Sequence, residues 1–193
     1  MIGKILQAVQ KPARNATHSV VGGEEKVLRQ NAKEIPVREI TTPKIKKILK
    51  EMSQALKSQS DGVAIAAPQI GYPLRIFVVS GKIFHESFIR GEVLPKGSKV
   101  PKDLVFINPK ISKLSHEKEW VVEGCLSVRW LYGNAHRSKK ATVTAYDENG
   151  KKFTRGASGL LAQIFQHEND HLNGILFIDH AKDIKEEIPA KIK

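Results

Sequence analysis

The chain has 193 residues, of which 40% are hydrophobic and 27% are charged, and its formal net charge is +12. This composition is typical of a globular domain with a core of its own; no apolar run approaches the roughly 20 residues of a membrane span, and no secretory signal is expected at the start. The single cysteine, Cys125, excludes an intrachain disulfide and favours a reducing compartment.

The positive charge favours a polyanionic partner, such as an RNA-rich particle. The basic residues are spread along the chain without an aromatic-interleaved RNA-binding motif, so we expect no sequence-specific recognition of nucleic acid. The alternative is a solvated, lysine-rich surface that aids solubility. Charge alone favours a ribosome-like partner but does not identify one.

The N-terminal residues predict an arm, about 1–25, and the first clear helix follows later. Glu24 and Glu25 allow a short helix to open near the end of this arm. Thr42 is expected to be the N-cap of the clear helix, with Pro43 at its first position. Apolar residues then recur with helical spacing while lysines occupy the other face; they are Ile45, Ile48, Leu49, Met52 and Leu56.

The middle of the chain predicts short strands joined by loops. Small residues predict a loop over 62–71, and Gly, Pro and charged residues predict an irregular insertion over 81–103. Strands are expected at 74–79, 104–107, 110–114 and 120–122.

A hairpin and a last helix follow. Residues 141–146 alternate as a strand, 147–150 form a turn and 151–154 return. Ser158 is expected to cap the last helix and Gly174 to follow its C-terminus. The fold class is therefore α+β, with short, mostly antiparallel strands packed around one central helix, and a short C-terminal tail at about 181–193.

The last helix contains the pattern His-Glu-x-x-His. A separation of four places His167 and His171 on one face, one turn apart, which is the geometry that one metal ion needs from two ligands. Glu168 projects from the same turn and can take a proton from a metal-bound water. Leu160 and Ile164 lie on the stripe of the histidines, so we expect this stripe to face inward rather than to carry two surface histidines.

A catalytic metal usually has a third protein ligand. The extended metalloprotease motif needs a ligand at position 177, which is Phe, so that pattern fails. Cys125 is another candidate, because a thiolate is a strong ligand for Fe(II) or Zn(II) and this residue follows an apolar strand. Downstream residues stay open as alternatives; they are Asp179, His180, Asp183, Glu186 and Glu187.

Three separate segments resemble the three signature motifs of peptide deformylase. In family order they are Gly62–Gln69, Glu123–Ser127 and Gln166–Gly174, and the second is intact at all five positions. The resemblance covers residues from about 25 to 180. It implies a single catalytic domain over 1–193, including the arm and the tail.

The resemblance also implies the roles of individual residues. Cys125, His167 and His171 would hold one divalent metal ion per chain, with water as the fourth ligand. Fe(II) is expected, and Zn(II), Ni(II) or Co(II) would also suit these ligands. Glu168 would be the general acid and base, while Gln69 and the backbone N–H of Leu126 would stabilise the oxyanion. The implied substrate-binding residues are Gly62, Val63, Ala64, Glu123 and Gly124.

One further position matches the family pattern and two positions depart from it, all near the expected substrate-binding cleft. Arg137 falls where the family has an arginine that pairs with the glutamate of the second motif, so we expect a partly buried Glu123–Arg137 ion pair that braces the Cys125 turn. Ala64 replaces the second glycine of the first motif and is expected to weaken or alter substrate binding. Arg129 and Trp130 stand where many relatives have proline, and we expect them at the mouth of the cleft.

The expected activity is removal of the formyl group from the N-terminal formylmethionine of new polypeptides. The setting would be a bacterial-type cytoplasm or an organelle, near the ribosomal exit tunnel and without a membrane. One alternative is a deacylase of the same fold with another acyl or peptide preference. A metallopeptidase is disfavoured by Cys125 together with Gln69, and a non-catalytic ribosome-binding protein is disfavoured because Glu168 and all three ligands are present.

Overall fold

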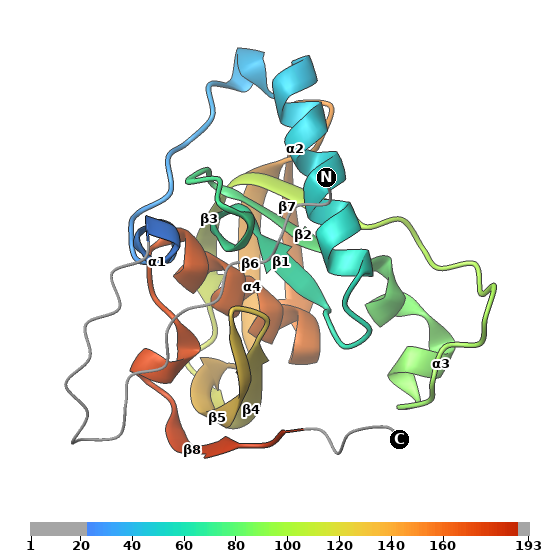
Figure 1. The fold of residues 1–193 in the computed structure, drawn as a ribbon, viewed down its shortest axis with the longest axis vertical. Helices are drawn as coiled ribbons and strands as arrows, with labels where there is room; N and C mark the ends of the chain where they lie inside the picture. Colours follow the sequence, from blue (N-terminus) through green and yellow to red (C-terminus); the bar gives the residue numbers. More distant parts are fainter. Residues whose placement is uncertain (1–22, 189–193) are drawn as a thin grey trace.

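Two antiparallel sheets and two long helices build the fold (Figure 1), described for residues 23–188 in a computed structural model. The larger sheet has the order β1-β2-β3-β6-β7 and the smaller sheet the order β4-β5-β8. The strands of the larger sheet are β1 (Ala64–Ala66), β2 (Ile76–Val79), β3 (Leu104–Leu114), β6 (Lys140–Tyr146) and β7 (Lys152–Ser158). Those of the smaller sheet are β4 (Lys118–Cys125), β5 (Val128–Ser138) and β8 (Lys182–Glu186). The expected α+β class is confirmed.

The helices range from single turns to four turns. The α-helices are α1 (Gly23–Leu28), α2 (Pro43–Lys57), α3 (Glu86–Ile89) and α4 (Gly159–Leu172). The 3-10 helices are η1 (Val37–Glu39), η2 (Ala67–Ile70), η3 (Gly81–Phe84) and η4 (Phe177–Asp179). No helix among residues 23–188 is long and apolar enough to cross a membrane.

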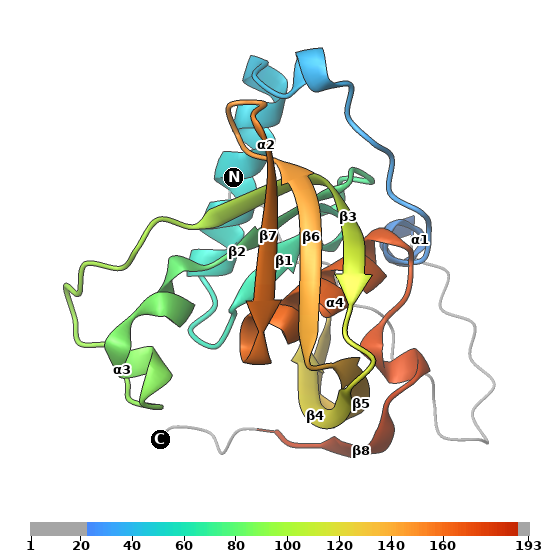
Figure 2. The ribbon, with the colours of Figure 1, turned by 180° about the vertical axis from the view of Figure 1, so that it is seen from behind.

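Side chains alternate between the two faces of the larger sheet, and β1, β2 and the first half of β3 are buried on both faces. On one face, Ile65 and Val78 pack against the apolar stripe of α2. On the other face, Phe77 and Phe106 stack with ring centroids 4.5 Å apart and pack against Phe165 of α4. Figure 2 shows this sheet from behind, with α4 crossing it and the β4–β5 hairpin below. The helix that carries the two histidines therefore lies at the centre of the molecule.

Both long helices begin where the sequence predicted, but neither expected side-chain cap is made. Thr42 occupies the N-cap position of α2, yet its hydroxyl donates to the carbonyl of Glu39 at 2.7 Å. Ser158 occupies the N-cap position of α4 without a capping hydrogen bond. Gly174 follows α4 with φ +72°, as expected for a glycine after a helix C-terminus.

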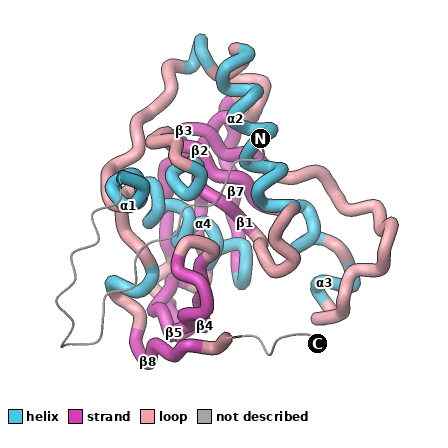
Figure 3. The backbone as a smooth tube through the Cα atoms, viewed as in Figure 1, coloured by secondary structure: helices cyan, strands magenta, loops and turns pink. Residues whose placement is uncertain are grey.

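Several expected loops contain regular structure. The small-residue segment 62–71 includes β1 and η2, because Ala64–Ala66 pair with β2 between the two packed layers. The two strands expected around Asn108 are one strand, β3, with an irregular register where Asn108 has φ +50°. The insertion 81–103 contains η3 and α3 and extends to one side of the larger sheet (Figure 3), while Ile83, Phe84 and Phe88 pack against the core.

Part of the expected C-terminal tail is a strand. β8 lies within the expected tail and pairs with β5, which was itself not predicted from the sequence. The short helix expected near Glu24 is present as α1. Most of the expected N-terminal arm, residues 1–22, lies outside the described residues.

Candidate active site

The three predicted ligands come together between α4 and the end of β4. Sγ of Cys125 lies 3.2 Å from Nε2 of His171, and the ligand atoms of Cys125, His167 and His171 all lie within 4.8 Å of one another. The two imidazole centroids are 4.9 Å apart with the rings at 74°. Residues that are 42 and 46 positions from Cys125 in the chain therefore converge on one point.

The turn at the end of β4 positions the thiol. The register between β4 and β5 shifts between Gly124 and Cys125, so that Cys125 lies opposite Val128 in a tight turn. A Cβ on Gly124 would come within 2.6 Å of the ring of Tyr132. The glycine is thus needed because the Tyr132 ring lies directly over the strand.

Glu123 and Arg137 form the expected ion pair. Nε and Nη2 of Arg137 donate to the two carboxylate oxygens of Glu123 at 2.8 and 2.9 Å, and the side chains are only 9% and 2% exposed. Nη1 of Arg137 reaches Asp170 of α4 at 2.7 Å. The same carboxylate of Glu123 lies 3.1 Å from Nδ1 of His167. Burial raises the pKa of Glu123, but His167 and Arg137 lower it more, to about 2.

The side-chain amide of Gln69 has one orientation. Its Oε1 accepts from the backbone N–H of Ala66 at 2.8 Å, so its Nε2 faces the cluster. Nε2 lies 3.1 Å from Oγ of Ser127 and 3.6 Å from Sγ of Cys125. An N–H donor is therefore fixed beside the thiol, as an oxyanion donor requires.

Glu168 is buried beside the cluster, and its Oε2 has no hydrogen-bond partner among the described residues. Burial raises its pKa to about 7, although the neighbouring His171 and His167 act in the opposite direction. A buried carboxylate oxygen without a protein partner is uncommon and fits a group bound in the cavity. The carboxyl can exchange a proton near neutral pH.

The donor set fits a divalent transition-metal ion. Burial raises the pKa of the Cys125 thiol, but His171 and His167 lower it more, to about 5, so the sulfur is a thiolate at neutral pH. Two imidazoles and a thiolate are ligands that such ions prefer. Glu123 fixes the ring of His167 from behind, as supporting carboxylates do for metal-bound histidines.

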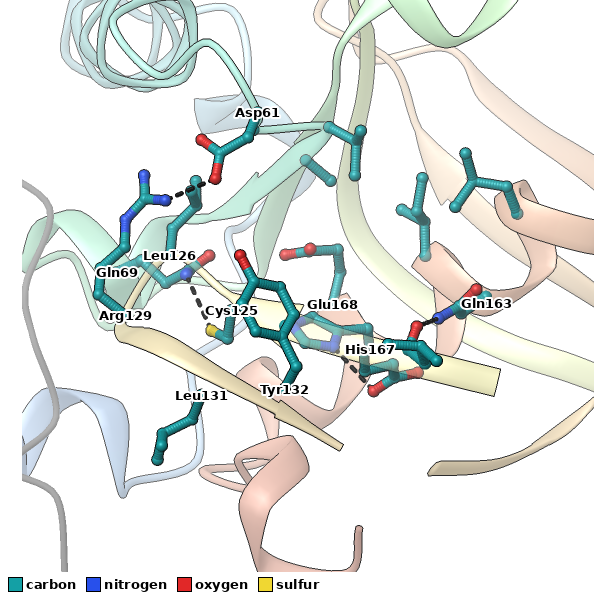
Figure 4. A pocket seen from close by; sticks show the side chains of 18 of the residues that line it. Asp61, Gln69, Cys125, Leu126, Arg129, Leu131, Tyr132, Gln163, His167 and Glu168 are labelled. Carbon is teal, nitrogen blue, oxygen red and sulfur yellow. Dashed lines mark hydrogen bonds and ion pairs between the residues drawn. The ribbon is translucent and has the colours of Figure 1, made fainter. Parts of the chain in front are cut away.

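A cleft of about 270 Å³ opens in front of the cluster (Figure 4). The five predicted substrate-binding residues all line it; they are Gly62, Val63, Ala64, Glu123 and Gly124. The carboxylate of Glu123, however, is turned towards His167 and Arg137. Arg129 and Trp130 also line the cleft, as expected at its mouth.

Three residues near the site were not singled out from the sequence. Ser127 accepts from Gln69, and Asp170 accepts from Arg137. Both belong to the recognised motifs, and this membership could have pointed to them. Tyr132 lines the cleft above Gly124, and no pattern in the sequence indicates this position.

The chain is similar to known proteins over most of its length. The family model described as polypeptide deformylase matches residues 17–187. Peptide deformylase 2 of Clostridium acetobutylicum is 40% identical over 156 residues, which are 81% of this chain and 89% of that protein.

Two solved structures have the same fold. A peptide deformylase from Synechococcus elongatus, in complex with actinonin, has a TM-score of 0.67 at 31% identity, over 92% of this chain and 86% of that one. A Met-Ala-Ser-bound peptide deformylase from Acinetobacter baumannii has a TM-score of 0.69 at 26% identity, over 91% and 99%. The chain therefore belongs to the polypeptide deformylase family, whose members remove the N-formyl group from nascent peptides.

Proposed function

We propose that this peptide deformylase holds one divalent metal ion with Cys125, His167 and His171. The observation that carries the proposal is the convergence of three ligand atoms within 4.8 Å, beside an oxygen of Glu168 that has no hydrogen-bond partner among residues 23–188. When bound, such an ion lowers the pKa of water and polarises a carbonyl oxygen. Fe(II) is the proposed ion, and the metal content of protein purified without oxygen distinguishes it from Zn(II), Ni(II) and Co(II).

Glu168 is the proposed general acid and base. Its pKa of about 7 lets it accept a proton from the water that attacks the formyl carbon. It then gives this proton to the amine nitrogen of methionine as the carbon–nitrogen bond breaks, which leaves formate and a free N-terminus. Burial keeps the carboxyl poised between its two protonation states.

Gln69 and the backbone N–H of Leu126 are the proposed oxyanion donors. The hydrogen bond from Ala66 holds the Gln69 amide with its N–H₂ group towards Cys125. Leu126 follows Cys125 directly, so its N–H belongs to the same turn. Each donor of this kind contributes about 3 kcal/mol to transition-state stabilisation.

The proposed substrate is the formylated N-terminus of a nascent chain, bound as an extended strand. β1 is an edge strand of the larger sheet and β4 is an edge strand of the smaller one, so both can pair with a peptide in the cleft. Apolar side chains at one end suit the methionine side chain; they are Val63, Val122, Leu160 and Ile164. The relative with bound Met-Ala-Ser supports this class of ligand.

The net charge of +12 supports an encounter with the RNA-rich surface of the ribosome near the exit tunnel. The proposed setting is accordingly a bacterial-type cytoplasm or an organelle that makes formylated chains. Co-sedimentation with ribosomes that is lost on adding salt tests this part of the proposal.

The activity is tested by amine and formate release from formyl-Met-Ala-Ser, using protein loaded without oxygen with Fe(II) or Ni(II). Glu168→Gln is expected to keep one metal ion per chain and to lose about a hundredfold to ten-thousandfold in kcat. Cys125→Ser is expected to lose the metal as well as turnover. Full activity of metal-loaded Glu168→Gln, or an unchanged metal content in Cys125→Ser, contradicts the proposed roles.

A further inference from the structure

The two ends of the cleft differ in charge. One end is apolar, and there Nε2 of Gln163 donates to the carbonyl of Val122 at 2.9 Å, which joins α4 to β4. The other end carries Asp61 and Arg129, which Figure 4 shows together, away from Gln163. A substrate that occupies the cleft therefore meets ionic groups at one end only.

Arg129 is held in place from three sides. Its Nη1 donates to Oδ2 of Asp61 at 2.6 Å, and its Nη2 donates to Oε1 of Gln59. Its guanidinium carbon lies 5.4 Å from the centroid of the Trp130 ring. A guanidinium that is fixed in this way loses little freedom when it meets a ligand. The contacts also join the loop before β1 to the start of β5, across the cleft.

Positive charge exceeds negative charge at this end. Nζ of Lys82 donates to the carbonyl of Ser60 at 2.8 Å, next to Asp61. Arg129 of the cleft lining and Lys82, which lies outside that lining, are thus two cations close to the carboxylate of Asp61. Partial burial raises the pKa of Asp61, but Arg129 lowers it more, so this carboxylate is ionised at neutral pH and neutralises only one of them.

The direction of the bound peptide places its later residues at the end of the cleft that contains Asp61 and Arg129. A peptide that pairs antiparallel with the edge strand β1, with its formyl group at the proposed metal ligands, would run alongside the chain from Ala64 back through Gly62, and Asp61 comes next. Residues that follow the formylmethionine therefore leave the cleft beside Asp61 and Arg129.

We infer that Arg129 is a specificity-determining residue for the substrate positions that follow formylmethionine, favouring acidic over basic side chains. The inference rests on the proposed function, because it requires the formylmethionine of the substrate to lie at the three proposed metal ligands. Asp61 tunes the effect: its carboxylate positions the guanidinium and partly offsets its charge. Asp61 is 51% exposed and Arg129 is 20% exposed, so both are accessible from the rim.

The test compares kcat/KM for formyl-Met-Asp-Ser and formyl-Met-Lys-Ser, and for formyl-Met-Ala-Asp and formyl-Met-Ala-Lys. Metal-loaded wild type is expected to favour the acidic peptide of at least one pair by about fivefold, which is the size of a partly exposed charge contact, and less at high salt. Arg129→Gln is expected to bring the ratio close to one. Asp61→Asn leaves Arg129 less neutralised and is expected to raise the ratio.

Arg90→Gln is the matched control, because it makes the same change in net charge just after α3, where Arg90 pairs with the exposed Glu86. It is expected to keep the wild-type ratio. A wild-type ratio near one, an unchanged ratio in Arg129→Gln, a fall in Asp61→Asn, or an equal loss in Arg90→Gln overturns the inference. Metal-loaded wild type that releases formate from no peptide, including formyl-Met-Ala-Ser, overturns the proposed function as well.

Discussion

Nδ1 of His167 lies 3.1 Å from Oε2 of Glu123, which leaves Nε2 of the ring to face the thiol and the second histidine. Both oxygens of the same carboxylate also accept from Arg137, and Arg137 continues to Asp170 on α4. A buried chain of charges thus connects β4, β5 and α4 behind the proposed metal ligands. The orientation of one ligand therefore depends on groups that never touch the metal.

Glu123→Gln is expected to weaken metal binding and the fold together. Within the described part of the chain, the neutral amide leaves the buried Arg137 with Asp170 as its one carboxylate partner, and the free energy of unfolding should fall by about 3 kcal/mol. Metal affinity, measured by competition with a chelator, should fall about 10- to 100-fold.

Glu117→Gln is the control, because this exposed carboxylate pairs with Lys139 far from the ligands, and it should change neither quantity measurably. Unchanged metal affinity and urea stability in Glu123→Gln would show that the ion pair does not brace the Cys125 turn.

The elements that the sequence predicted best are those with their own local signal. The apolar stripe of α2 and the turn before β7, where Asp147 accepts from Asn149 and Lys151, are specified by residues that are close in the chain. β8 has the charged sequence Lys-Asp-Ile-Lys-Glu and is a strand only because β5 pairs with it. A strand that forms only through such long-range pairing has no hydrophobic periodicity in its own sequence from which it could be predicted.

The residues of the candidate site show the same difference between local sequence signals and long-range contacts. The spacing of His167 and His171 and the recognised motifs predicted residues that the structure brings together. Tyr132 could not be predicted, because its place over Gly124 depends on the register between β4 and β5. The contact of Arg129 with Asp61 could not be predicted either, since Asp61 is 68 residues away in the chain.

Gln69→Glu tests the donor role of the amide. A glutamate keeps an oxygen that accepts from Ala66 but has no N–H₂ group, so the fold should survive while kcat falls about a hundredfold to a thousandfold. Gln163→Glu is the matched control, because it makes the same substitution at the opposite end of the cleft. Its kcat should change far less. Equal losses in the two variants would mean that added charge in the cleft, rather than the lost donor, reduces turnover.

Ala64→Gly tests whether the departure in the first motif affects the substrate. Ala64 lies in an extended strand that alanine adopts without strain, and its methyl group packs in the core beside α4 with only 6% of the residue exposed. The variant should lose about 1 kcal/mol of unfolding free energy through the lost methyl and the freer backbone. KM for formyl-Met-Ala-Ser should stay within twofold of wild type. A several-fold fall in KM would instead support the weakened substrate binding that is expected from Ala64 in the sequence.

Gly174→Ala separates backbone strain from crowding after the helix that carries the ligands. Gly174 has φ +72°, and a Cβ there would lie 2.7–2.8 Å from the backbone carbonyl group of Arg29. Gly91 has nearly the same φ, +73°, but nothing lies within 4 Å of a Cβ added to it. Gly91→Ala should therefore lose only the strain of a left-handed alanine, about 1 kcal/mol.

Gly174→Ala should lose clearly more, because its neighbours are backbone atoms that cannot rotate away, and Gly174 N–H donates to the carbonyl of His171 at 3.2 Å. The displacement of the backbone at Gly174 should also move the proposed metal ligands on α4. Competition with a chelator should therefore show weaker metal binding in Gly174→Ala and wild-type metal binding in Gly91→Ala. Equal losses of urea stability in the two variants would show that the backbone at Arg29 moves aside, and that contact with this segment does not fix the C-terminus of α4.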